Sequence, residues 1–220
     1  MNEAKLKKFE EKVIRRLGKI LSLHIFDEPR PNYVSHVTIT DKLLAATLLK
    51  FFPNFVRPNY LTAFRFIATP FLIYFLLQEN YIISFWLFIV AVSTDALDGA
   101  IARTRNHITD WGIVFDPLAD KLLIGSVSLI VISKFISPIM AGLIVAIEIL
   151  LVISSYLRFR GEIVPAKTVG KIKMVLQSVG VFVLLLAIVT QLSILVSVST
   201  GILCLAIFFG LLSLFVYRSI

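Results

Sequence analysis

Residues 95–120 read DALDGAIARTRNHITDWGIVFDPLAD, and this stretch decides how the rest of the chain is interpreted. Aspartates recur in it at helical spacing, inside sequence that is otherwise largely apolar. At about 100° per residue, Asp95 and Asp98 share one stripe of a first helix, and Asp116 and Asp120 share one stripe of a second. Because the loop between them is short, we expect antiparallel neighbouring helices whose acidic stripes face each other.

The surrounding sequence is typical of a membrane protein. Of the 220 residues, 58% are hydrophobic and only 16% are charged, and the mean hydropathy is +0.89. Residues 174–217 contain no Asp, Glu, Lys or Arg. About 20 apolar residues cross the hydrocarbon core, so this run alone can hold two spans. The composition excludes an ordinary soluble domain and a disordered chain, and the lone Cys204 excludes an intrachain disulfide.

We therefore predict an all-α integral membrane protein, with six transmembrane helices preceded by amphipathic juxtamembrane helices. Residues 1–57 form a cytoplasmic N-terminal extension, in which residues 6–20 and 40–52 repeat apolar side chains at helical spacing. Residues 58–220 form the six-helix domain. Its expected spans are Leu61–Gln78, Tyr81–Arg103, Gly112–Lys134, Pro138–Leu157, Val169–Gln191 and Ser193–Tyr217.

The basic residues at the span ends predict the orientation. One side receives most of the cations, whereas the other receives only Lys134. Because Lys and Arg favour cytoplasmic loops, both termini are expected in the cytoplasm. The cations on that side are Arg57, Arg103, Arg105, Arg158, Arg160, Lys167, Lys171, Lys173 and Arg218.

The four aspartates predict a metal site. Carboxylates facing one another at membrane depth repel unless cations neutralise them, and oxygen-only donors favour hard ions such as Mg²⁺, Mn²⁺ or Ca²⁺. Asp95 lies ten residues before Arg105, or roughly 15 Å along a helix, which places the site in a pit open to the cytoplasm. The residues alone also allow helix caps, salt bridges to Arg103 and Arg105, or a route for cations.

The spacing of residues 95–120 resembles a known signature. Its pattern D-x₂-D-G-x₂-A-R-x₈-G-x₃-D-x₃-D is that of the CDP-alcohol phosphatidyltransferases, and all eight fixed positions are present. The six-helix core of that family agrees with the span count, and the resemblance covers about Pro58 to Arg218. By this likeness the chain transfers a phosphatidyl group from a CDP-linked donor to an alcohol and releases CMP.

The resemblance also implies roles for individual residues. Asp95, Asp98, Asp116 and Asp120 would hold two divalent cations, Mg²⁺ or Mn²⁺, and Asp120 would be the general base. Asp98 would also take part in donor binding. Gly99 and Ala102 would let the nucleotide lie against the helix backbone, and Arg103 would meet donor phosphate. Close helix packing is the alternative for the two small residues.

Further segments narrow the likeness to bacterial phosphatidylglycerophosphate synthases, with cardiolipin synthases close behind. Pro58-Asn59-Tyr60-Leu61-Thr62-Ala63-Phe64-Arg65 resembles their P-N-x-L-T-x-x-R entry to the first span. Asn59 and Thr62 would then contact the donor nucleotide, unless they only start and cap the helix. The DPLADK and GKIKMVLQ segments, beginning at Asp116 and Gly170, are similar to those of the same two groups.

One departure from the likeness concerns the acceptor. An Arg-Glu pair expected in the fourth span is Ile147-Glu148 here, and Ser155 stands where a second Arg would fall. The cations near the cytoplasmic mouth still favour a phosphorylated acceptor such as glycerol 3-phosphate. They are Arg158, Arg160, Lys167, Lys171 and Lys173.

Three classes of function remain open from the sequence. The first is a CDP-alcohol phosphatidyltransferase in a bacterial plasma membrane, acting on CDP-diacylglycerol within membrane lipid. Its acceptor would be glycerol 3-phosphate, with phosphatidylglycerol or inositol phosphate as alternatives. The second is a cation-binding transporter, and the third a catalytically silent scaffold. The family habit implies a homodimer, and no nucleic-acid partner is expected.

Overall fold

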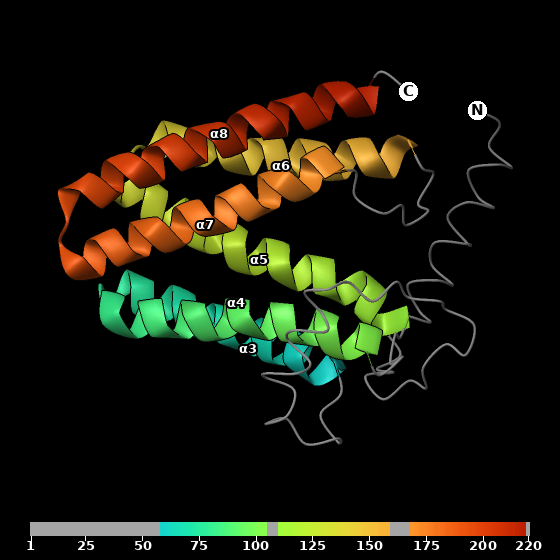
Figure 1. The fold of residues 1–220 in the computed structure, drawn as a ribbon, viewed down its shortest axis with the longest axis horizontal. Helices are drawn as coiled ribbons and strands as arrows, with labels where there is room; N and C mark the ends of the chain where they lie inside the picture. The colour runs from blue at the N-terminus through green and yellow to red at the C-terminus, as the bar shows by residue number, and fades with distance from the viewer. Residues whose placement is uncertain (1–57, 105–109, 159–167, 219–220) are drawn as a thin grey trace, which may run out of the picture. The chain divides into compact units, whose positions relative to one another are not determined.

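The computed structural model describes residues 58–104, 110–158 and 168–218, and these residues form six α-helices (Figure 1). Each begins and ends within three residues of a predicted span, so the predicted helices are confirmed. The predicted amphipathic helices of the N-terminal extension lie outside the described residues. The six are α3 (Pro58–Leu77), α4 (Tyr81–Thr104), α5 (Asp110–Phe135), α6 (Pro138–Arg158), α7 (Thr168–Thr190) and α8 (Ser193–Arg218).

Local sequence explains where these helices begin and end. Pro58 and Pro138 open α3 and α6, where a missing backbone N–H costs nothing. Asn80 caps α4, because its side-chain oxygen accepts a hydrogen bond from the Ile83 N–H at 3.4 Å. Beyond the ends of α3 and α7, Glu79 and Gln191 adopt left-handed backbone angles, with φ of 60° and 56°. This conformation reverses the chain directly after each helix.

The membrane prediction is supported in part. Within the described ranges, three helices are long and apolar enough to span a bilayer, over Asn59–Leu77, Val169–Thr190 and Ser193–Leu214. Shorter apolar stretches cover Tyr81–Asp95 and Pro138–Ser154. The protein is therefore a membrane protein, and the crossing of the membrane by α4, α5 and α6 stays a prediction. Charged side chains explain the difference for α5, which carries Asp116, Asp120, Lys121 and Lys134.

The chain divides into two compact units, each of which is described separately. In its described part, the first unit contains the start of α3 up to Arg65, the end of α4 from Val92, and the start of α5 up to Ala119. Its buried residues are unusually polar for a membrane protein, since Asn59, Thr62 and Arg65 are all buried. A buried polar residue normally has a hydrogen-bond partner, so we expect a polar site in this unit.

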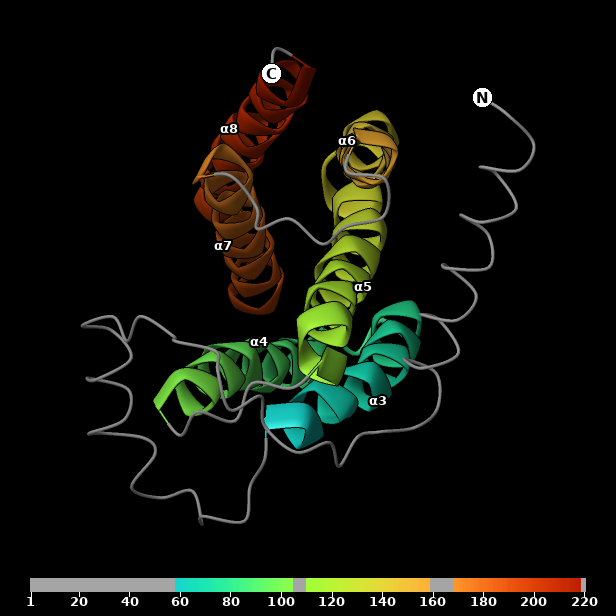
Figure 2. The same cartoon turned by 90° about the vertical axis from the view of Figure 1, so that its right-hand side faces the viewer.

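The second unit contains residues 66–91 and the described residues from Asp120 onward. In it α7 and α8 run antiparallel and side by side (Figures 1 and 2). Gly180 permits their close approach, because a Cβ there would lie 2.7 Å from Leu203 Cδ2. Large apolar side chains such as Phe71, Trp86 and Phe208 face outward, whereas Ser128, Lys173, Gln177 and Ser199 are buried. An apolar exterior around polar buried residues is the pattern expected in lipid.

Candidate active site

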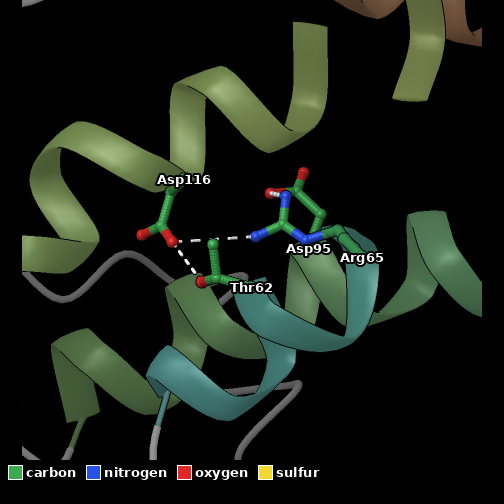
Figure 3. Close-up of polar contacts among 4 residues, drawn as sticks. All are labelled: Thr62, Arg65, Asp95 and Asp116. Atoms are coloured by element: carbon green, nitrogen blue, oxygen red, sulfur yellow. Dashed lines mark hydrogen bonds and ion pairs between the residues drawn. The ribbon is translucent and has the colours of Figure 1, made fainter. Parts of the chain in front are cut away.

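Three side chains of the first unit gather near the guanidinium of Arg65 (Figure 3). Arg65 Nη1 lies 3.0 Å from Asp95 Oδ1, and Arg65 Nη2 lies 3.8 Å from Asp116 Oδ1. The Thr62 hydroxyl donates a hydrogen bond to the same Asp116 oxygen. We call Thr62, Arg65, Asp95 and Asp116 the Arg65 cluster. It brings side chains of α3, α4 and α5 to one point.

Helical spacing explains why α3 supplies two of these side chains. Thr62 and Arg65 are three residues apart, so they project from the same face of α3. Both are buried, while neighbouring Phe64 and Ile67 are exposed apolar side chains. The first turns of α3 therefore present one polar face to α4 and α5 and one apolar face outward.

The charges of the Arg65 cluster are unequal, and its members differ in exposure. Arg65 is 0% exposed, whereas the Asp95 side chain is 47% exposed and that of Asp116 is 34% exposed. One buried cation thus serves two carboxylates that still present surface for a ligand. Such an arrangement can accept further positive charge, which a cation, or a cation together with an anionic substrate, would supply.

The chemistry of these donors fits divalent cations. Asp95 and Asp116 come from different helices, yet both carboxylates approach the same positive group. Oxygen-only donors are the ligands that Mg²⁺ and Mn²⁺ prefer. Among the side chains that the structure describes, no three acidic, histidine or cysteine residues gather closely enough to hold a metal ion. The side chain of Asp98 lies outside that set, although its backbone continues α4 one turn beyond Asp95.

The other predicted residues of the metal and donor sites lie on the same helices. Asp120 follows Asp116 by one turn of α5, and Asn59 is buried at the start of α3. Gly99, Ala102 and Arg103 lie in the last turns of α4, where side chains are not described. The structure thus brings Thr62, Asp95 and Asp116 together.

The predicted acceptor residues are placed less completely. Lys171 is exposed on α7. Lys173 is 3% exposed, and its Nζ lies 2.7 Å from Glu148 Oε1. Arg158 ends α6, with its side chain outside the described part, and Arg160 and Lys167 lie outside the described residues.

Two features were missed from the sequence. Arg65 was noted only as part of a motif, although an arginine inside an apolar span needs a partner, and its spacing from Thr62 was the available signal. Glu148 was noted only for the missing arginine before it. As the one acid in an apolar helix, it predicts a buried cation on another helix, and that cation is Lys173.

The part of the chain that carries these helices is similar to known proteins. Residues 55–212 match the family model for CDP-alcohol phosphatidyltransferase. The chain is 36% identical to the CDP-diacylglycerol--glycerol-3-phosphate 3-phosphatidyltransferase of Rickettsia typhi, over 134 residues that are 59% of this chain and 75% of the relative. The protein of the same name from Bacillus subtilis is 39% identical over 102 residues, 46% of this chain and 53% of the relative.

A third relative differs in its name. It is a "Cardiolipin synthase (CMP-forming) / mitochondrial hydrolase fusion protein" from Schizosaccharomyces pombe, 34% identical over 108 residues that are 48% of this chain and 18% of the relative. The family match extends over most of the chain and includes the whole Arg65 cluster. The chain therefore belongs to the CDP-alcohol phosphatidyltransferase family, and it is a phosphatidyltransferase.

Proposed function

We propose that this protein transfers the phosphatidyl group of CDP-diacylglycerol to glycerol 3-phosphate, giving phosphatidylglycerophosphate and CMP. The observation that carries the proposal is the convergence of Asp95 and Asp116 on one buried cation, in a chain whose relatives carry the name of that reaction. Partly exposed carboxylates from two helices, sharing one cation, suit a site for pyrophosphate and its counter-ions.

Two divalent cations complete the proposed site. Asp95, Asp98, Asp116 and Asp120 would hold them, and the identity of the donors fits Mg²⁺ or Mn²⁺. When bound, such ions neutralise pyrophosphate charge and stabilise the leaving CMP. Donor binding, proton transfer and acceptor binding are assigned to side chains of the protein.

The donor nucleotide is assigned to residues at the start of α3 and at the end of α4. Asn59 and Thr62 are buried on the polar face of α3, where their polar groups would orient the nucleotide. Gly99 and Ala102 would leave room for it against the backbone of α4, and Arg103 would meet donor phosphate. The diacyl tails stay in lipid while the CDP head occupies this polar region.

Asp120 is the proposed general base. Its carboxylate would take the proton of the acceptor hydroxyl as that oxygen attacks the β-phosphorus of the donor. A new P–O bond forms to the acceptor, and the P–O bond to the CMP phosphate breaks. CMP carries away the electron pair and the negative charge. Asp120 lies one helical turn from Asp116, so the proposed base and another proposed metal ligand are carried by the same helix.

The acceptor phosphate is assigned to the cations of the predicted cytoplasmic mouth. Lys171 suits this role best, because its side chain is exposed. Lys173 is neutralised by Glu148, so we assign it the lesser share of the binding. Arg158, Arg160 and Lys167 complete the proposed acceptor set.

Cardiolipin synthesis with phosphatidylglycerol as acceptor is the second candidate. It is favoured by the cardiolipin synthase relative and by the pairing of Glu148 with Lys173 at a position where an Arg-Glu pair would have supplied an extra cation. Inositol phosphate or another polyol acceptor is the third. We further propose a homodimer in a bacterial plasma membrane, with the active site and both termini in the cytoplasm.

The test is CMP release by the purified protein in mixed micelles. CDP-diacylglycerol and Mg²⁺ or Mn²⁺ are supplied with glycerol 3-phosphate, phosphatidylglycerol or inositol phosphate, each in a separate reaction. Release with glycerol 3-phosphate alone, abolished by EDTA, is the expected result. Release with a different acceptor would replace the acceptor assignment, and release unaffected by EDTA would remove the metal from the proposal.

Two matched variants accompany that assay. Asp120→Asn removes the proposed base while keeping its shape, so turnover should fall while CDP-diacylglycerol still binds. Lys134→Met removes a cation whose exposed partner is Glu79, far along α5 from Asp120, and should leave turnover unchanged. Full turnover by Asp120→Asn across the pH range would overturn its assignment as base.

A further inference from the structure

Arg65 is a fully buried charged side chain to which the proposed reaction gives no role. It is 0% exposed, and it lies in α3, a helix apolar enough to cross a membrane. A charge in such a place is costly unless it is paired. It forms ion pairs with carboxylates on two other helices, Asp95 and Asp116 (Figure 3).

Those same carboxylates are the proposed metal ligands, which gives Arg65 a specific relation to the metal. Without a metal ion or Arg65, the negative charges of Asp95 and Asp116 would repel each other and push α4 and α5 apart. The guanidinium offers several N–H groups in a rigid plane, so it can serve two carboxylates at once. A bound divalent cation would also compensate the charge of these two carboxylates. The contribution of Arg65 to stability would then be smaller.

We infer that Arg65 is a positioning residue, the built-in counter-ion that holds Asp95 and Asp116 together when no metal is bound. This inference rests on the proposed metal site. It assigns to α3 the task of keeping the site assembled between turnovers, so that metal and donor enter an arrangement that already exists. Thr62 assists from the same face by its hydrogen bond to Asp116.

The experiment compares thermal unfolding of wild type and Arg65→Met in detergent, each with EDTA and with saturating Mn²⁺. In EDTA the variant should melt lower by about 5 to 10 °C, because its two carboxylates have lost their cation. Mn²⁺ should recover most of that loss, so the Mn²⁺-induced rise in Tm should be larger in the variant than in wild type. Arg65→Lys keeps the charge but loses the planar fork, so its Tm in EDTA should lie between those of wild type and Arg65→Met.

Lys134→Met is the matched control, since it also removes one cation from an ion pair. Its side chain is exposed, so its Tm should change little, and by the same amount in EDTA and in Mn²⁺. An Arg65→Met loss that is equal in both conditions would overturn the inference and leave Arg65 as a packing residue. A loss smaller than that of Lys134→Met would overturn it as well.

The outcomes separate this inference from the proposed function. If wild type releases no CMP from CDP-diacylglycerol, the proposed reaction fails whatever Arg65→Met does in the melting experiment. If wild type releases CMP in a metal-dependent manner and Mn²⁺ does not recover Arg65→Met, the reaction stands and the role of Arg65 falls.

Discussion

Two ion-pair arrangements in this chain differ in how their charges are shared. In the Arg65 cluster, one buried guanidinium serves two carboxylates that remain partly exposed. In the second arrangement, which we call the Glu148 pair, Lys173 and Glu148 are 3% and 11% exposed and neutralise each other one to one. The first arrangement has negative charge left over and surface to bind a ligand, whereas the second has neither.

The difference separates function from stability. A closed pair in a buried layer contributes by avoiding an uncompensated charge, and little further chemistry is open to it. An open cluster gives up part of that compensation and keeps carboxylate oxygens exposed, where the proposed substrate and metal would bind. The two arrangements should therefore respond differently to the same conservative change, Asp to Asn or Glu to Gln.

The largest expected effect is on turnover, from Asp116→Asn. The amide keeps an oxygen that can accept the Thr62 hydrogen bond, so we expect the fold to persist. The lost charge should lower CMP release by at least about 100-fold, because even outer partners of metal ligands contribute roughly 10- to 100-fold. The measurement is CMP release beside a melting curve, and a large drop in Tm with little loss of turnover would reverse the comparison.

Glu148→Gln should show the opposite balance, with stability as its main loss. Lys173 would be left as a buried charge without its carboxylate, which costs about 3 kcal/mol, or roughly 10 °C in apparent Tm for a protein of this size. Thermal unfolding in detergent measures it. In the double variant Glu148→Gln/Lys173→Met the stranded charge is gone, so most of the lost Tm should return. A double variant no more stable than Glu148→Gln would show that the pair does not act as a unit.

A smaller effect is expected one turn further along α7, where polar groups are neutral. The buried Gln177 Nε2 donates a hydrogen bond to Ser128 Oγ at 3.1 Å. Ser128→Ala removes the acceptor and should cost about 1 kcal/mol of unfolding free energy. Ser126→Ala is the control, because within the described residues its hydroxyl bonds to carbonyls of its own helix, at Leu122 and Leu123. Equal losses in the two variants would mean that the Gln177 contact contributes nothing.

The sequence predicted the helices well because their signals are local. Apolar runs and their polar turns placed all six described helices. The aspartate spacing predicted acidic stripes on two neighbouring helices, and Asp95 and Asp116 from those helices both approach Arg65. The pairing of Arg65 and of Glu148 depends instead on which helices pack together. Lys173 illustrates the limit, since in sequence it looks like its exposed neighbour Lys171, and only the position of α6 makes it a buried partner of Glu148.

The smallest expected effect concerns the turns after α3 and α7. The turn after α3 carries a third ion pair, Glu79 with Lys134, whose side chains are both exposed. Gln191 holds a φ of 56°, which costs a residue with a Cβ about 1 kcal/mol or more. Gln191→Gly should therefore raise the unfolding free energy by up to about 1 kcal/mol, partly offset by the greater freedom of glycine in the unfolded chain. Glu79→Gly relieves the same strain at a φ of 60°. It also removes the carboxylate whose Oε1 lies 2.5 Å from Lys134 Nζ. Both side chains of that pair are exposed, so the difference between the two glycine variants should stay below about 1 kcal/mol. A larger difference in the melting curves would mean that exposure alone does not decide what an ion pair contributes in this protein.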